Sequence, residues 1–255
     1  MQLHQPRLAE MVAGMLRERI LAGQLKDGDA LPRQEDLLAE FQVSKPSLRE
    51  ALRILEAEGL ITVRRGNRGG AVVHVPQATN AAYMIGLVLQ HRRATYADVG
   101  GAIQAIEPLC AGMIARRDDR MDTILPRLTE IHEQIIDAVD DEVEFTRLSR
   151  RFHEEVVRGC GNETLILVVG ALESLWSSRE EAWAHDAKRL GSFPDGKQRQ
   201  QGIRAHARIL QLLEAGDAGQ VERHARRHLD SSLYHTMSAA ADKVVDSAGM
   251  LNGGR

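Results

Sequence analysis

Basic side chains recur at every fourth residue in one short stretch near the start of the chain: Lys45, Arg49 and Arg53. On a helix, this spacing places the three cations on one face. Apolar residues define another face of the same stretch: Leu48, Ala51, Leu52 and Leu55. A helix that buries an apolar stripe and exposes a cationic ridge is suited to the major groove of duplex DNA.

A second group of cations follows, around a glycine-rich segment. The β-rich runs 60–64 and 71–75 flank a turn at 66–70, and this pattern predicts a hairpin. Its glycines, Gly66 among them, let the backbone approach a phosphate or the floor of a groove. The cations of this hairpin are Arg64, Arg65 and Arg68. We therefore predict a wing that contacts DNA beside the basic helix.

Three helices are needed to position these side chains. Ser44 is a predicted N-cap for the helix that begins at Lys45, with Ser47 as a weak capping-box partner, and Gly59 ends that helix. Apolar spacing predicts two further helices upstream, one near residues 8–22 and one over 33–41. Together with the hairpin, these elements predict a winged helix-turn-helix domain over residues 1–76.

Local charge supports a nucleic-acid surface in this part of the chain. Residues 41–75 carry six basic and three acidic residues, a net charge of +3, whereas the whole chain has −3. An ordinary solvated helix and hairpin are the alternative. The basic ridge, the cap and the wing occur together in register, and this coincidence favours DNA binding. Residues 76–255 have a net charge of −4, so we expect no second nucleic-acid surface there.

Helical patterns replace the β signal after Pro76, so the predicted fold class is mainly α. We expect an all-helical bundle of about six to seven helices over 77–240 and a disordered tail over 241–255. The predicted helices are 80–93, 95–117, 121–139, 141–159, 163–185, 197–215 and 217–240. One predicted core stripe consists of Leu165, Val168, Val169, Leu172, Leu175 and Trp176.

Two features bear on the compartment in which the chain functions. Cys110 and Cys160 lack the spacing of a disulfide framework or a paired metal motif, which fits a reducing environment. The first residues contain no apolar run typical of a signal peptide, and the longest apolar run, 165–172, is too short to cross a bilayer. We expect a cytoplasmic protein without a membrane partner.

Residues 8–75 resemble the winged-helix domain of the GntR superfamily of bacterial transcription regulators. The motifs are Ile20-x-x-Gly23, Gly28-Asp29-x-Leu31-Pro32, Val43 to Leu52, Glu58-Gly59-Leu60 and Arg65-Gly66. The resemblance implies that Ser44, Lys45, Ser47 and Arg49 face DNA and that Arg65 and Gly66 form the wing tip. The family often has Arg at the positions of Lys45 and Glu35. Arg33 is the candidate to substitute for the family's arginine at the position of Glu35.

Residues 80–235 resemble the helical effector domain of the fatty-acid-regulator (FadR) branch, called FCD. The motifs are Ile106-Glu107, Phe152-His153, Gly161-Asn162, His206 to Leu210, Ala215-Gly216-Asp217 and His228-Leu229. The resemblance implies that His153, His206 and His228 line a cavity and hold one divalent metal, Zn, Ni or Mn. Ser149 stands where the family usually has an acidic ligand. The alternative is that the histidines only make hydrogen bonds inside the pocket, and His224 is a possible substitute ligand.

The effector pocket implied by this resemblance contains Ser149, His153, His206 and His228. Family members that bind small carboxylates often carry Arg at the position of Ile103. Without this arginine and without the acidic ligand, the cavity favours a more apolar effector, such as an apolar acid or an acyl-CoA.

The leading functional hypothesis is a transcriptional regulator, not an enzyme. We expect a repressor that binds a palindromic operator as a homodimer and responds to a small-molecule effector. One alternative is a metal-dependent helical hydrolase that combines the three histidines with His185-Asp186. Another is an architectural nucleic-acid protein without an effector, which the large second domain argues against.

Overall fold

The structure is a computed structural model of the 255-residue chain, and it describes residues 8–64, 70–76, 78–240 and 242–247. For residues 79 and 233–240, it describes the backbone alone. The chain divides into two compact units, Met1–Gln77 and Ala78–Arg255.

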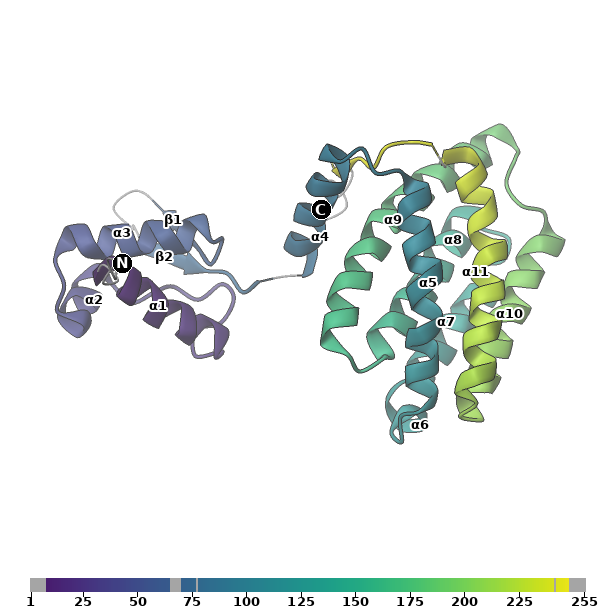
Figure 1. The fold of residues 1–255 in the computed structure, drawn as a ribbon, viewed down its shortest axis with the longest axis horizontal. Helices are drawn as coiled ribbons and strands as arrows, with labels where there is room; N and C mark the ends of the chain where they lie inside the picture. Colours follow the sequence, from purple (N-terminus) through teal and green to yellow (C-terminus); the bar gives the residue numbers. More distant parts are fainter. Residues whose placement is uncertain (1–7, 65–69, 77, 241, 248–255) are drawn as a thin grey trace, which may run out of the picture. The chain divides into compact units, whose positions relative to one another are not determined.

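The first unit contains three helices and a two-stranded antiparallel hairpin (Figure 1). The helices are α1 (Leu8–Leu21), α2 (Gln34–Phe41) and α3 (Lys45–Ala57), and the strands are β1 (Ile61–Arg64) and β2 (Gly70–Val73). Their shared core is built from aliphatic side chains on one face of each element. It includes Val12, Leu16, Ile20, Leu37, Leu48, Leu55, Ile61 and Val73. The predicted winged helix-turn-helix fold is thereby confirmed.

Local signals set the ends of the basic helix α3. The Ser44 hydroxyl accepts a hydrogen bond from the backbone N–H of Ser47 at 3.3 Å, which satisfies one of the amides that lack a helical partner. Pro46 occupies the first turn, where its missing N–H costs nothing. At the other end, Gly59 has a φ of +73°, so a residue without a Cβ turns the chain toward β1.

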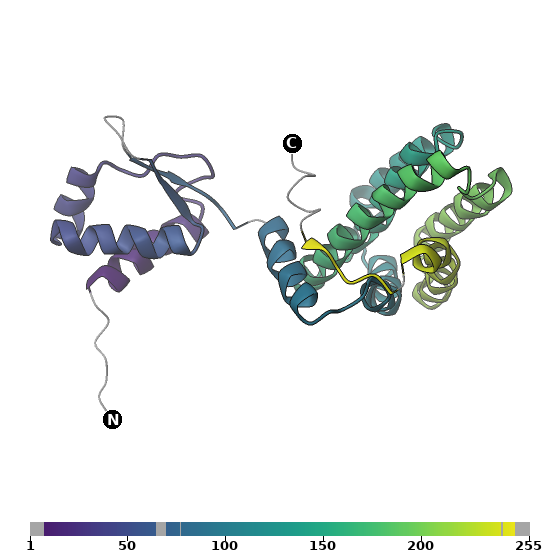
Figure 2. The ribbon, with the colours of Figure 1, turned by 90° about the horizontal axis from the view of Figure 1, so that it is seen from above.

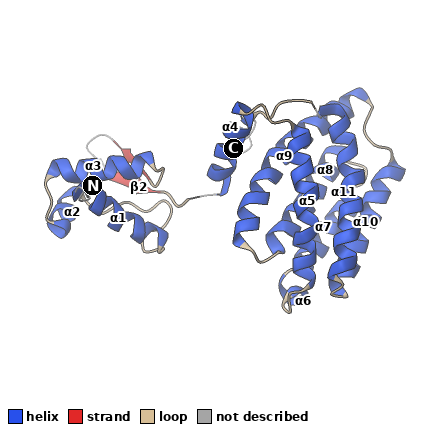
Figure 3. Cartoon of the chain, viewed as in Figure 1, coloured by secondary structure: helices blue, strands red, loops and turns tan. Residues whose placement is uncertain are grey.

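Within the residues that the structure describes, every named secondary-structure element of the second unit is a helix (Figure 3). In Figure 1, α5 lies between α9 and α11, with α7 and α8 behind them, and α5 packs most extensively against α11. None of the described helices is long and apolar enough to cross a membrane. The elements are α4 (Ala78–His91), α5 (Tyr96–Ala115), α6 (Arg120–Thr123), α7 (Leu125–Asp137), α8 (Glu142–Gly159), α9 (Glu163–Leu190), α10 (Gly196–Glu214) and α11 (Ala218–Ala240).

Two predicted helices differ from those observed. The predicted helix 121–139 is divided into α6 and α7 at Ile124, because Pro126 begins a new helix and cannot donate to the preceding turn. The predicted helix 163–185 continues to Leu190 and ends only at Gly191, which has a φ of +63°. Thr95 and Asp98 form a capping box at the start of α5.

A proline inside α5 is accommodated by a contact from α11. Pro108 has no backbone N–H, so the carbonyl of Gln104 lacks its usual helical donor. The Arg226 guanidinium donates a hydrogen bond to this carbonyl at 3.2 Å. The contact therefore satisfies a helix defect and also joins α5 to α11.

Residues 242–247 pack against the bundle, although the sequence predicted a disordered tail from residue 241. Val244 forms a β-bridge with Thr95, and the Val245 side chain is buried. The Ser247 hydroxyl donates to the Gln90 side chain at 2.8 Å. In Figures 1 and 2, this yellow segment runs from α11 to α4. Small and polar composition had suggested disorder, but a buried valine and backbone pairing hold the segment in place.

Candidate functional site

The outer face of α3 presents the predicted basic ridge. Lys45, Arg49 and Arg53 are all exposed, whereas Leu48, Ala51 and Leu55 on the opposite face are buried. Arg53 has one exposed ion pair, with Glu50 at 3.5 Å, and such pairs are weak in water. Among the described residues, Lys45 and Arg49 form no ion pair, so both charges remain available to a phosphate or a base edge.

The other predicted DNA-contacting residues are placed as follows. Ser44 is exposed and Ser47 half-buried, and their hydroxyl oxygens lie 2.9 Å apart at the start of α3. Arg33 is exposed at the N-cap of α2, and Arg64 is exposed at the end of β1. The predicted wing-tip residues Arg65, Gly66 and Arg68 lie outside the described residues.

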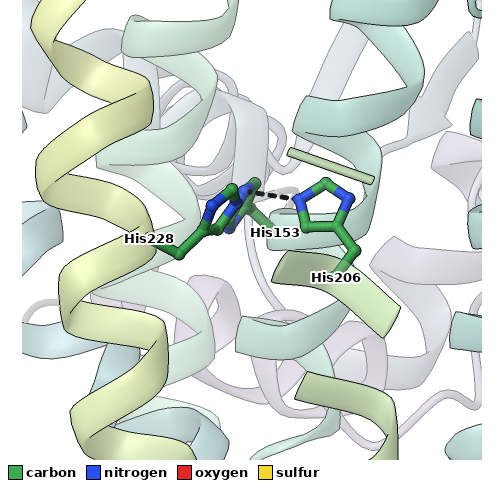
Figure 4. A group of neighbouring side chains, drawn as sticks. All are labelled: His153, His206 and His228. Carbon is green, nitrogen blue, oxygen red and sulfur yellow. Dashed lines mark hydrogen bonds between the residues drawn. The ribbon is translucent and has the colours of Figure 1, made fainter. Parts of the chain in front are cut away.

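Three histidines from three helices converge in the second unit (Figure 4). His153 of α8, His206 of α10 and His228 of α11 are 3%, 2% and 9% exposed. Each offers one ring nitrogen to a group of atoms that all lie within 4.8 Å of one another. The Nε2 atoms of His153 and His206 are 3.3 Å apart, and Nε2 of His228 is buried without a hydrogen-bond partner.

This arrangement could hold a metal ion. Two imidazole nitrogens bound to one tetrahedral zinc ion at roughly 2.0–2.1 Å are themselves about 3.3 Å apart, close to the observed separation. Burial lowers the pKa of His153 to about 3 and lowers those of His206 and His228 well below their usual value. All three rings are therefore neutral at physiological pH, which is the form that binds metals.

Ser149 lies one helical turn before His153 and lines the same cavity. Its hydroxyl oxygen is buried and has no hydrogen-bond partner. His224 also lines the cavity, but it is outside the three-histidine group that the described residues form. Ser149 is therefore a polar neighbour of His153 on α8, and His224, the possible substitute ligand, does not join the group.

Behind the histidines lies a buried network of charged residues that sequence reasoning missed. Glu107 of α5 places Oε1 2.5 Å from His153 Nδ1. Arg150 of α8 forms an ion pair with Glu173 of α9 and lies 3.4 Å from Glu180. Burial is the main cause that raises the pKa of Glu107 to about 7 and that of Glu173 to about 8. Because burial also keeps His153 neutral, its contact with Glu107 is a hydrogen bond and not an ion pair.

Faint sequence signals for this network exist. Glu173 interrupts the apolar stripe that continues to Leu175 and Trp176, and Glu180 follows Glu173 by two turns on the same face. A carboxylate in a core stripe requires a partner. The partner's identity is not visible from the sequence, because Arg150 is separated from Glu173 by 23 residues and lies on another helix.

The histidines open onto a cavity of about 860 Å³. Phe152 supports this wall by stacking on His206, with ring centroids 4.3 Å apart. The cavity combines aromatic surface with polar and cationic groups. Its lining includes Phe145, Ser149, Arg150, His153, Glu180, Trp183, Phe193, Gln198, Arg199, His206, His224, Arg227, His228 and Ser231.

The residues of the hydrolase alternative do not assemble. Asp186 is exposed and forms an ion pair with Arg189 one turn away, and His185 is exposed beside it. Neither belongs to the three-histidine group. A hydrolytic metal centre needs such residues at the metal, so this geometry does not support it.

Comparison with known proteins agrees with both halves of the structure. Residues 8–73 match the family described as "Bacterial regulatory proteins, gntR family", and residues 100–231 match the FCD domain. The chain belongs to the GntR family, in its FCD-containing, FadR-like branch. The members of this family are DNA-binding transcriptional regulators with an effector-binding domain, and they are not enzymes. The family expected from the sequence motifs is therefore confirmed.

Curated relatives of this GntR regulator extend over nearly its whole length. It is 26% identical over 239 residues to the HTH-type transcriptional repressor NanR of Klebsiella aerogenes, covering 90% of this chain and 85% of the relative. It is 25% identical to NanR of Salmonella newport over 257 residues, covering 95% of this chain and 91% of the relative. Among solved structures, a Streptococcus agalactiae GntR protein has the same fold, with a TM-score of 0.65, 20% identity, and coverage of 88% of this chain and 97% of that one.

Proposed function

We propose that the protein is a repressor that binds a palindromic operator as a homodimer and releases it in response to a small-molecule effector in the FCD cavity. Two copies of α3, related by a two-fold axis, suit two half-sites of opposite orientation. Relatives named as repressors, at 25–26% identity, support the direction of regulation. Such a regulator acts where the chromosome is, in the bacterial cytoplasm.

The exposed cations of α3 carry this proposal. Lys45, Arg49 and Arg53 are the proposed major-groove residues. Ser44, Ser47 and Arg33 are proposed to contact the phosphate backbone. Arg64, Arg65, Gly66 and Arg68 are proposed to form the wing contact.

Operator binding can be tested by fluorescence anisotropy with the promoter duplex beside the protein's own gene. Arg49→Ala should weaken binding by roughly 1–3 kcal/mol if Arg49 contacts a base edge, and less if it contacts a phosphate. Lys26→Ala is the matched control, because it removes an exposed cation away from α3. Equal affinities for wild-type protein and Arg49→Ala would remove Arg49 from the interface.

We further propose that the histidine cluster holds one divalent ion, Zn, Ni or Mn, through His153, His206 and His228. Three neutral imidazoles leave coordination positions open, and these can accept an oxygen of the effector. Ser149, with its unpartnered hydroxyl, is proposed as a polar contact of the same effector. Native mass spectrometry of the purified protein tests the metal content directly.

The cavity lining supports an effector that has both an acidic group and an apolar part. Arg199, Arg227 and the histidine centre suit a carboxylate, and Phe145, Trp183 and Phe193 offer aromatic surface. An apolar acid or an acyl-CoA has this combination. Isothermal titration should therefore give tighter binding for such acids than for lactate or citrate. A coupling of about 1–3 kcal/mol between effector and operator is sufficient for a switch.

A further inference from the structure

Within the described part of the chain, the histidine cluster offers three potential metal ligands, and none of them is a carboxylate. Its three members are imidazoles, which carry no negative charge, and Ser149, which lines the same cavity, has a hydroxyl and not a carboxylate. A divalent ion in a buried site is costly unless nearby groups compensate its charge. A compensating anion is therefore needed close to the ligands.

Glu107 is placed to supply that anion through His153. Its side chain is buried on α5, and its Oε1 lies 2.5 Å from Nδ1 of His153. The other ring nitrogen, Nε2, lies 3.3 Å from Nε2 of His206. When Nδ1 donates its hydrogen to Glu107, the lone pair of Nε2 is directed toward the other histidines, where an ion would bind.

The position of Glu107 is itself fixed by buried neighbours. Glu173, which interacts with Glu107, is paired with Arg150, and Arg150 lies 3.4 Å from Glu180. Glu180 accepts a hydrogen bond from Trp176 Nε1 at 3.1 Å. These contacts join α5, α8 and α9 behind His153, so the carboxylate has little freedom to turn away from the ring.

We propose that Glu107 is the anionic positioning residue of this metal centre: it fixes the His153 tautomer and compensates the charge of the ion from behind the ring. A hydrogen-bonded carboxylate also makes an imidazole a better ligand. The site thus has no need of a carboxylate in contact with the metal. This inference rests on the metal centre proposed above, and it adds Glu107 to that centre as a residue that acts through His153.

The test is a zinc-affinity series measured by competition with a chromophoric chelator. Glu107→Gln keeps the shape and an acceptor oxygen but removes the charge, and it should weaken Zn²⁺ binding by roughly 10–100-fold. Adding Ser149→Asp to that variant should restore part of the affinity, because it places a carboxylate beside the histidines. Glu144→Gln makes the same change on α8 outside the cavity lining, so it is the matched control and should bind like wild type. Unchanged affinity in Glu107→Gln would overturn the proposal while leaving the metal centre intact.

A second measurement applies to the wild-type chain and does not depend on the folding of any variant. Long-range ¹⁵N–¹H NMR of the zinc-loaded protein should show His153 protonated at Nδ1 and bound through Nε2. Protonation at Nε2 would overturn the role of Glu107. If wild-type protein bound zinc no more tightly than a His206→Ala variant, the metal centre would fail, and the role of Glu107 with it.

Discussion

Replacement of Arg150 by Met should strongly destabilise the FCD unit, and by an amount that depends on pH. The guanidinium is almost fully buried and faces Glu173 and Glu180, which are also buried. Removing one partner of a buried ion pair costs about 3–5 kcal/mol, because the remaining charge has no compensation. Against a typical total of about 5–15 kcal/mol, this is a large fraction of the free energy of unfolding.

The pH dependence follows from the sign of the carboxyl pKa shifts. Burial raises the pKa of Glu173 to about 8, well above the roughly 4.5 of an unfolded glutamate, so the folded state holds the extra proton between these values. Its contribution to stability therefore falls as pH rises from about 4.5 to 8. Loss of Arg150, which lowers this pKa, should extend that fall to higher pH. The cost of Arg150→Met should be about 3–5 kcal/mol at pH 8 and clearly smaller at pH 5.5.

Urea unfolding followed by tryptophan fluorescence measures this cost specifically in the FCD unit, because both tryptophans, Trp176 and Trp183, lie in α9. Arg147→Met is the matched control. Arg147 is exposed on the same helix and pairs with half-buried Glu144, so its loss should change stability by less than about 1 kcal/mol. A cost below about 1 kcal/mol for Arg150→Met at pH 8, or a cost that is the same at both pH values, would refute the reasoning.

Four further outcomes are expected. His206→Ala should leave operator affinity without effector largely intact and lower metal content in native mass spectrometry; global unfolding in circular dichroism would indicate a structural role instead. Phe152→Ala, which removes a fully buried ring, should lower the free energy of unfolding by about 3–5 kcal/mol in urea titrations. Gly59→Ala should lower the free energy of unfolding of the first unit by about 1–2 kcal/mol in thermal unfolding, because Gly59 has a φ of +73°, which a residue with a Cβ disfavours. Arg65→Ala should reduce the slope of log affinity against log salt by about one unit if Arg65 neutralises one phosphate, and an unchanged slope would place Arg65 away from the DNA backbone.

The first unit was largely predictable from sequence because its signals are local. The Ser44 cap, the glycine at position 59 and the alternation of cations with aliphatic residues each act within one or two helical turns. They specify both α3 and its exposed face. The neutral Ser149 beside the histidines was also identified, but only through resemblance to a family, because residues on three helices have no common local pattern.

The parts that sequence reasoning missed depend on contacts distant in the chain. Val168 was assigned to the core stripe but is 43% exposed, since apolar spacing alone does not say how far neighbouring helices cover α9. The partners of Glu107, Glu173 and Glu180 lie on other helices or about one turn away. Short polar segments such as 242–247 also gain order only from surfaces formed elsewhere, here by α4 and α5.

The segment 242–247 sets a lower limit on the piece of chain needed to study effector binding in isolation. A fragment that stopped at the end of α11 would remove Val245 from the core cluster that also contains Tyr96 and Leu229, and it would remove a backbone partner from Thr95. Newly uncovered aromatic and aliphatic surface promotes self-association. A recombinant FCD fragment should therefore extend through Ser247, with any affinity tag separated from it by a spacer.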